Sequence, residues 1–227
     1  MPVCLAIDTS TRHTGLALQA GGALELRRFA PQRNAGELLL PAIHELLAGC
    51  GLAAQDLDVI VLANGPGSFT GLRIGLATAK GLAFGGRAAL VPVSTLEVLA
   101  WQAPTRQGHV FPLMDARRGE VFSACWRRQG ESLLPVDEVR RVPIPDLLAS
   151  LPDDALLLGP SLLEQRAAFL DAERHPQLAE DPDCQLALPW LLRLGERRWE
   201  RQGGEDPDSL EPDYLFDFQP TPGKVRA

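Results

Sequence analysis

The sequence has 227 residues, which is enough for one large domain or two small ones with a sizeable hydrophobic core. Its formal net charge of −7 at pH 7 disfavours a protein that binds nucleic acid by itself, although such a chain can still work in a complex that does. The four cysteines are scattered without a Cys-x-x-Cys pair, as expected of free thiols in a reducing compartment. There is no signal peptide and no apolar run long enough to cross a membrane, so we expect a cytoplasmic protein.

The first hundred residues predict three strands followed by alternating helices and strands. The predicted elements are strands at 3–7, 14–20 and 23–29, a helix at 36–49, a strand at 58–63, a helix at 70–85 and a strand at 88–93. The second and third runs are joined by Gly21-Gly22, which is typical of a hairpin. A polar turn, Asp8-Thr9-Ser10-Thr11, follows the first strand. This order of elements is typical of the opening of the actin-like kinase and Hsp70-type ATPase fold.

The rest of the chain predicts a smaller second lobe. Its expected elements are a short helix at 95–103, strands at 109–116 and 119–126, a helix at 144–151, a strand at 155–158, and helices at 162–172 and 190–201, with a loop at 175–184. A strand again ends in an aspartate, Asp115, as at Asp8, which indicates a second copy of the layout. We therefore divide the chain into a first lobe (1–103), a second lobe (104–188), a segment returning to the first lobe (189–218, with 211–216 docking on it) and a disordered tail (219–227).

The stretch 63–85 joins a buried strand, a turn rich in Gly and Pro, and a helix. No Gly-Lys-Ser/Thr closes the turn, so it is not a Walker A loop, and Ser68 or Thr70 is expected to cap the helix. Gly71 and Gly75 share one side of a helix that has almost no polar face. Such a helix is held by close packing, either in a deep core or at a subunit interface. The helix at 36–49 also has more apolar surface than one core face needs.

Several motifs carry a resemblance to a known family. They are Ala6-Ile7-Asp8-Thr9-Ser10-Thr11, the run Gly65-Pro66-Gly67-Ser68-Phe69-Thr70-Gly71-Leu72-Arg73-Ile74-Gly75, Ser94-Thr95-Leu96-Glu97, Asp115-Ala116-Arg117 and Glu120-Val121-Phe122. The chain resembles the TsaB (YeaZ) family over nearly its full length, most strongly in the first half. The late Pro212-Asp213-Tyr214-Leu215 element also matches, but Phe216 stands where the family usually has Arg.

The resemblance implies an α/β, actin-like (ASKHA) fold of two lobes with a shortened second lobe. It also implies a non-catalytic scaffold that pairs with TsaD, the subunit that transfers the threonylcarbamoyl group to the tRNA adenosine beside the anticodon. The ATPase TsaE joins this complex, and the chain contacts tRNA only as part of the complex. By itself the chain forms a homodimer through the face that pairs with TsaD. The interface is expected on the first two helices, at Leu38, Leu39, Ile43, Leu46, Leu47, Gly71, Leu72, Arg73, Gly75, Leu76, Ala79 and Leu82.

Two expectations follow for this interface. Gly75→Leu or Leu39→Asp should abolish pairing and leave the monomer folded. For Arg73, three alternatives stay open: a partner carboxylate, a nucleotide phosphate lodged between subunits, or a solvated charge.

The candidate chemistry of the chain itself is limited. The histidines His13, His44, His109 and His175 are isolated, so the i, i+4 pair of a metal site is missing. Asp8 could hold a magnesium-bound water, but Asp8, Thr9 and Ser10 are expected only to satisfy the backbone of their turn.

The second nucleotide loop is expected to be degenerate. In the loop that begins at Asp115, the long side chains of Arg117 and Arg118 stand where the backbone should approach a phosphate. Arg117 and Glu120 are expected to pair across a hairpin. We therefore expect no cofactor, with a nucleotide at the subunit interface left open. The alternative is a small phosphotransferase that uses Asp8 and Asp115 around Mg-ATP, which calorimetry would reveal.

Overall fold

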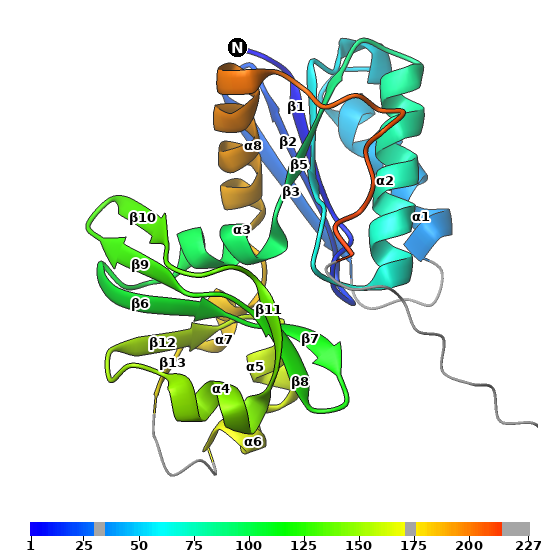
Figure 1. Cartoon of the computed structure of the whole chain (residues 1–227). Coiled ribbons are helices and arrows are strands. Elements are labelled where there is room, and N and C mark those ends of the chain that lie inside the picture. The colour runs from blue at the N-terminus through cyan, green and yellow to red at the C-terminus, as the bar shows by residue number, and fades with distance from the viewer. Residues whose placement is uncertain (30–34, 171–175, 215–227) are drawn as a thin grey trace, which may run out of the picture.

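Five strands form the sheet of the first lobe in the computed structural model, which describes residues 1–29, 35–170 and 176–214 (Figure 1). They are β1 (Cys4–Asp8), β2 (Thr14–Ala20), β3 (Ala23–Phe29), β4 (Val59–Ala63) and β5 (Ala89–Val93), in the spatial order β3-β2-β1-β4-β5. β1 runs antiparallel to β2 and parallel to β4. Every residue of β1 and β4 is buried, as expected of central strands that are covered on both faces.

Helices cover both faces of this sheet. α1 (Ala35–Gly49) and α2 (Phe69–Phe84) lie on one face, and α8 (Leu188–Gln202) lies on the other (Figure 1). α3 (Thr95–Gln102) packs against α8 and against the second lobe. The alternation along β1 divides the core accordingly, because Leu5 and Ile7 pack with the leucines of α1 while Ala6 packs with those of α8. A short 3-10 helix, η1 (Ala54–Asp56), precedes β4.

The second lobe repeats the sheet of the first. Its strands are β6 (Gln107–Pro112), β9 (Trp126–Gln129), β10 (Ser132–Pro135), β12 (Ala155–Leu158) and β13 (Gln177–Leu178), in the order β10-β9-β6-β12-β13. β6 runs antiparallel to β9 and parallel to β12, as β1 does to β2 and β4. The second copy of the layout predicted from Asp8 and Asp115 is therefore confirmed.

A second sheet and several short helices make up the rest of this lobe in the described residues. The sheet consists of β7 (Met114–Arg117), β8 (Glu120–Ser123) and β11 (Arg140–Pro143). The helices are α4 (Ile144–Ser150), α5 (Pro160–Glu164), α6 (Arg166–Leu170) and α7 (Asp181–Cys184).

Several predictions for this lobe were wrong in detail. The helix expected at 162–172 is divided into α5 and α6 at Gln165, whose φ of −125° leaves the helical region. The loop expected at 175–184 contains β13 and α7, and each of the two strands expected at 109–116 and 119–126 is a pair of shorter strands. The expected disordered tail, 219–227, lies outside the described residues.

The chain returns to the first lobe through α8. Gly195 allows this close approach, because a Cβ there would collide with the side chain of Val61 in β4. Residues 203–214, which we call the C-terminal strap, then cross β5, where the amide of Glu205 donates to the carbonyl of Leu90 at 2.8 Å. None of the helices in the described part of the chain combines the length and apolarity needed to span a membrane.

Candidate functional site

The glycine-rich turn lies between β4 and α2 and packs against the turn that follows β1. Ser68 is the N-cap of α2, and its hydroxyl accepts from the amide of Gly71 at 3.3 Å, which confirms one of the two predicted caps. The amide of Ser68 donates to the carbonyl of Ser10 at 2.7 Å. A Cβ at Gly67 would collide with that same Ser10 carbonyl, so the absence of a side chain is what lets the two turns meet.

Packing against Thr9 requires glycine at positions 71 and 75. A Cβ at Gly71 would collide with the carbonyl of Thr9, and one at Gly75 would collide with the Thr9 hydroxyl. The predicted close approach of another backbone is real, but the backbone belongs to the same chain. Packing within the lobe therefore accounts for both glycines, and a partner contact at these positions stays a prediction.

Most of the apolar residues predicted for the interface are buried in the core of the first lobe. These are Leu39, Ile43, Leu46, Leu47, Leu72, Leu76 and Ala79. Leu39, Ile43, Leu46, Leu47 and Ala79 belong to one core cluster together with residues of β1 and β4, so they pack against the sheet. Leu82 packs partly against the same cluster, whereas Leu38 is 38% exposed and Arg73 is exposed.

The burial of Leu39 and the position of Gly75 change the variants that can test an interface. Leu39 is only 1% exposed, so Leu39→Asp would bury an unpaired carboxylate in the core. Gly75→Leu would drive a side chain into Thr9. Neither variant is now expected to leave the monomer folded, contrary to the prediction from the sequence.

The outward side of the two helices carries a different set of apolar and small residues. We call it the outer helix face: Leu40 and His44 on α1, and Ala77, Gly81 and Phe84 on α2. Leu40 is 53% exposed and Phe84 is 96% exposed, and a Cβ at Gly81 would meet no atom within 4 Å. The spacing 77, 81 and 84 places the three α2 residues on one side of the helix.

Arg73 is engaged by the C-terminal strap. Its Nε donates to the hydroxyl of Tyr214 at 2.8 Å, and its guanidinium carbon lies 4.2 Å from the ring centroid of Phe69. Tyr214 also lies against Phe69, with ring centroids 4.9 Å apart. The sequence did not reveal this contact, although the Pro-x-Tyr-Leu element was the available signal.

The strap also covers the glycine-rich turn. The side-chain amide of Asn64 donates to the carbonyl of Glu211 at 2.9 Å, and the amide of Asp213 donates to the carbonyl of Asn64 at 2.8 Å. Docking of 211–216 on the first lobe is thus confirmed for 211–214, while Leu215 and Phe216 lie outside the described residues.

Asp8 of the first predicted nucleotide loop is committed to its own turn. The hydroxyl and the amide of Ser10 both donate to Asp8 Oδ1, at 2.6 and 2.9 Å. Burial raises the pKa of the Asp8 carboxyl above its ordinary value, although the hydrogen bonds from Ser10 act in the opposite direction. Asp8, Thr9 and Ser10 are all buried, and this geometry supports the expectation that they satisfy a turn.

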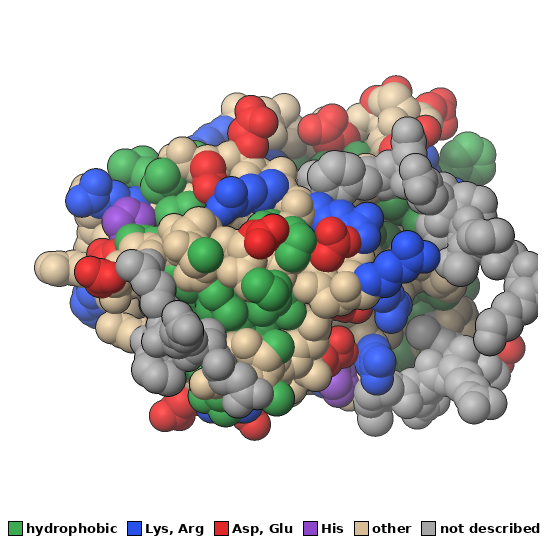
Figure 2. Space-filling view, turned by 60° about the horizontal axis from the view of Figure 1, so that its bottom comes forward, with side chains coloured by type: hydrophobic (Ala, Val, Ile, Leu, Met, Phe, Trp, Pro, Cys, Tyr) green, Lys and Arg blue, Asp and Glu red, His purple; other side chains and the backbone are tan. Residues whose placement is uncertain are grey.

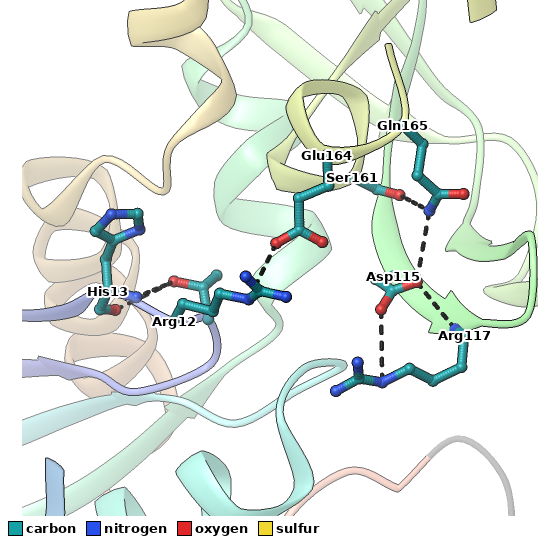
Figure 3. A network of polar contacts seen from close by, with 8 residues as sticks. Arg12, His13, Asp115, Arg117, Ser161, Glu164 and Gln165 are labelled. Carbon is teal, nitrogen blue, oxygen red and sulfur yellow. Dashed lines mark hydrogen bonds and ion pairs between the residues drawn. The ribbon is translucent and has the colours of Figure 1, made fainter. Parts of the chain in front are cut away.

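In the second predicted nucleotide loop, Asp115 is bonded to Arg117 of the same loop and to Gln165 (Figure 3). Asp115 Oδ1 accepts from the amide of Arg117 at 3.0 Å and from the side-chain amide of Gln165 at 3.5 Å. Arg117 and Arg118 form the β7–β8 hairpin turn in the left-handed region, with φ of 70° and 56°. Arg117 and Glu120 are paired in the hairpin, as predicted, but the ion-pair partner of Glu120 is Arg141.

An ion pair links the two lobes beside these loops. Arg12, from the turn after β1, reaches Glu164 on α5, with Nε and Oε1 3.6 Å apart (Figure 3). Over the middle of the face shown in Figure 2, acidic and basic side chains are interspersed. Such a mixed surface does not concentrate positive charge as a phosphate site does.

The histidines do not gather. His109 Nδ1 lies 2.6 Å from Asp154 in the second lobe, His13 is in the turn after β1, and His44 is exposed on α1. His175 lies outside the described residues. Within residues 1–29, 35–170 and 176–214, no three His, Cys, Asp or Glu side chains are grouped to hold a metal ion.

Comparisons with known proteins match curated TsaB proteins and part of a TsaD family model. A family model described as "TsaD: tRNA N6-adenosine threonylcarbamoyltransferase" matches residues 30–142. The chain is 35% identical to the tRNA threonylcarbamoyladenosine biosynthesis protein TsaB of Bacillus subtilis over 78% of this chain and 75% of that protein. It is 34% identical to TsaB of Escherichia coli over 63% of each chain.

Solved structures match the fold as well. YeaZ from Pseudomonas aeruginosa superposes with a TM-score of 0.78 at 27% identity, over 95% of this chain and all of that one. The ethanolamine utilization protein EutJ from Carboxydothermus hydrogenoformans superposes with a TM-score of 0.50 at 11% identity, over 86% of this chain and 90% of that one, which speaks to the fold alone. The predicted actin-like ATPase fold of two α/β lobes is confirmed.

Proposed function

The chain belongs to the TsaB family of tRNA threonylcarbamoyladenosine biosynthesis proteins, and from this premise we propose that it is a non-catalytic subunit that binds TsaD. In this role it supports transfer of the threonylcarbamoyl group to the tRNA adenosine beside the anticodon. TsaE joins the complex, and the chain alone forms a homodimer. The modification takes place in the cytoplasm.

The outer helix face is the observation that carries the proposal. Two adjacent helices of 15 and 16 residues present Leu40, Phe84 and the small residues Ala77 and Gly81 outward. Small residues let another helix approach closely, while an exposed Phe buries a large area when it meets a partner. Leu40 and Phe84 therefore replace Leu39, Ile43 and the other buried leucines as the proposed direct contacts.

The candidate nucleotide loops support a role without catalysis. Oδ1 of each aspartate that a phosphotransferase would need is engaged within the chain, because Asp8 accepts from Ser10 and Asp115 accepts from Arg117 and Gln165. The long side chains at Arg117 and Arg118 also stand where backbone amides would have to approach phosphate. These contacts weigh against the Mg-ATP alternative.

Reconstitution tests the function directly. The purified chain, TsaD and TsaE of the same organism are supplied with threonylcarbamoyl-adenylate and tRNA, and the modified adenosine is followed by mass spectrometry. We expect modification to require this chain, and the chain alone to modify nothing. Equal modification by TsaD without the chain would contradict the proposed role.

A matched pair of variants tests the interface. Leu40→Asp should abolish co-elution with TsaD in gel filtration, because it places a charge on the outer helix face. Leu134→Asp is the control, since Leu134 on β10 is also 53% exposed but lies in the second lobe. If both variants pair with TsaD as the wild type does, the assignment of this face is wrong.

A further inference from the structure

One side of α8 carries a line of arginines and a tryptophan, and a second tryptophan, from α3, lies against the first. Trp190, Arg193, Arg197 and Arg201 follow one another at spacings of three and four residues, which places them on the same side of the helix. Trp101 of α3 lies against Trp190, with ring centroids 5.7 Å apart and the rings inclined by 26°. We call these five residues the α8 basic stripe.

Two of the three arginines of the stripe lie over the tryptophan rings. The guanidinium carbon of Arg193 lies 5.1 Å from the centroid of Trp190, and that of Arg197 lies 6.0 Å from the centroid of Trp101. Both tryptophans pack partly against the core, so they form a fixed base. Cation–π contacts of this kind orient a guanidinium while its outer N–H groups still face solvent.

The carboxylates near the stripe do not form ion pairs with its three arginines. Glu97 pairs with Arg198 at 2.8 Å, and Glu196 accepts from Gln19 at 2.5 Å. Glu200 is exposed on the same helix. Among the described residues, Arg193, Arg197 and Arg201 nevertheless form no ion pair with any carboxylate, and this stands out in a chain with a net charge of −7.

We propose that the α8 basic stripe binds the phosphate backbone of the substrate tRNA, an inference that rests on the proposed function for the identity of the RNA. The three arginines extend over about 12 Å along a rigid helix, so they present a line of charge rather than a single site. A line of unpaired guanidinium groups matches the regular charge of a nucleic-acid strand.

The position of the stripe is compatible with the proposed complex. α8 covers the face of the first-lobe sheet opposite to α1 and α2 (Figure 1). A partner on the outer helix face therefore leaves the stripe open. The stripe would give this chain a direct contact with tRNA, whereas the sequence predicted contact only through the complex.

Salt-dependent binding tests the proposal. An unmodified tRNA transcript is titrated into the chain alone at low salt and into its complex with TsaD, for the wild type and for the triple variant Arg193→Gln, Arg197→Gln, Arg201→Gln. We expect the variant to lose roughly 10- to 100-fold in affinity and to reduce the slope of log K against log salt by about 2. In the modification assay, KM for tRNA should rise while kcat is unchanged.

The matched control removes the same charge elsewhere. Arg106, Arg127 and Arg140 are exposed on the second lobe, and their replacement by Gln should leave tRNA affinity close to the wild-type value. Equal losses in both triple variants would reduce the effect to net charge and overturn the proposal. The proposal would also be overturned if the Arg193, Arg197 and Arg201 triple variant bound tRNA as the wild type does but no longer bound TsaD or TsaE. The stripe would then be a protein-docking surface.

The two proposals fail in different ways. If the chain and TsaD do not assemble, the proposed function fails, and the titration of the chain alone still decides whether the stripe binds tRNA. If the wild-type chain binds no tRNA either alone or in the complex, the stripe proposal is overturned while the scaffold role stands.

Discussion

Arg73 Nε and the Tyr214 hydroxyl are joined by a hydrogen bond of 2.8 Å although 141 positions separate the two residues in the chain. The bond ties the second turn of α2 to the end of the C-terminal strap. Because Phe69 packs against both partners, the contact combines a polar bond with the burial of two rings.

Shortening Tyr214 should loosen this end of the strap. Tyr214→Phe keeps the ring against Phe69 and loses only the hydrogen bond, so we expect a loss of about 1 kcal/mol in the free energy of unfolding. Tyr214→Ala removes the ring as well and should cost about 2 kcal/mol. Urea unfolding measures both, and limited proteolysis should cut the Ala variant within 203–214 first. Equal stability of the three proteins would mean that the strap contributes nothing to the fold.

Two glycines of α2 should respond to alanine in opposite directions. Gly71→Ala drives a Cβ into the Thr9 carbonyl and should destabilise the chain by at least about 2 kcal/mol. Gly81→Ala meets open space in a helix interior and should stabilise it by about 0.5–1 kcal/mol. Thermal unfolding at a dilute, monomeric concentration compares them. A stabilising Gly71→Ala would show that the two turns do not meet as described.

The buried carboxyl of Asp8 makes stability depend on pH. Its raised pKa means that the folded state keeps this proton to a higher pH than the unfolded chain does. Folding therefore loses stability as the pH rises from about 4, the unfolded pKa, through the raised folded value. Asp8→Asn cannot ionise, so its stability relative to the wild type should increase over that range. Urea unfolding at a series of pH values gives the difference. A difference that falls with pH would mean that the hydrogen bonds from Ser10 outweigh burial.

The four thiols should differ sharply in reactivity. Cys50 is exposed at the end of α1, while Cys4, Cys125 and Cys184 are buried. Burial also raises the pKa of Cys4 to about 12 and that of Cys125 to about 11, which lowers their thiolate fraction. Ellman's reagent at pH 8 should titrate one thiol rapidly and the other three only after denaturation. Cys50→Ser should remove the fast phase, and a fast phase that persists would place another cysteine at the surface.

The first lobe was predicted well because its elements are long and its patterns are regular. The Gly21-Gly22 hairpin, the buried strand 59–63 and the cap at Ser68 each follow from local sequence. The second lobe uses strands of two to six residues, and two of them, Ser132–Pro135 and Arg140–Pro143, are too short and too polar to show a period. Arg140–Pro143 pairs with β8, which is distant in the sequence, whereas Ser132–Pro135 forms a hairpin with the adjacent β9.

The candidate interface was predicted only as far as helix composition allows. The excess of apolar residues on α1 and α2 is visible in the sequence, but the direction of each side chain is not. Leu39 and Leu40 are adjacent, and the sheet formed by β1 and β4 buries the first and leaves the second 53% exposed. Likewise Gly75 and Gly81 read alike as helical glycines, yet Thr9 lies beside one and open space beside the other.

The return of α8 to the first lobe means that one face of the first-lobe sheet can be covered only late in synthesis. The sheet face formed by Cys4, Ala6 and Val61 is covered by residues from 188 onward, so a nascent chain that has completed α1, α2 and all five strands still exposes apolar surface to the ribosome exit and to chaperones. The strap that closes over the glycine-rich turn comes later still. A ribosome that stalls before α8 would therefore release a chain that contains every strand of the first lobe but leaves one face of its sheet uncovered.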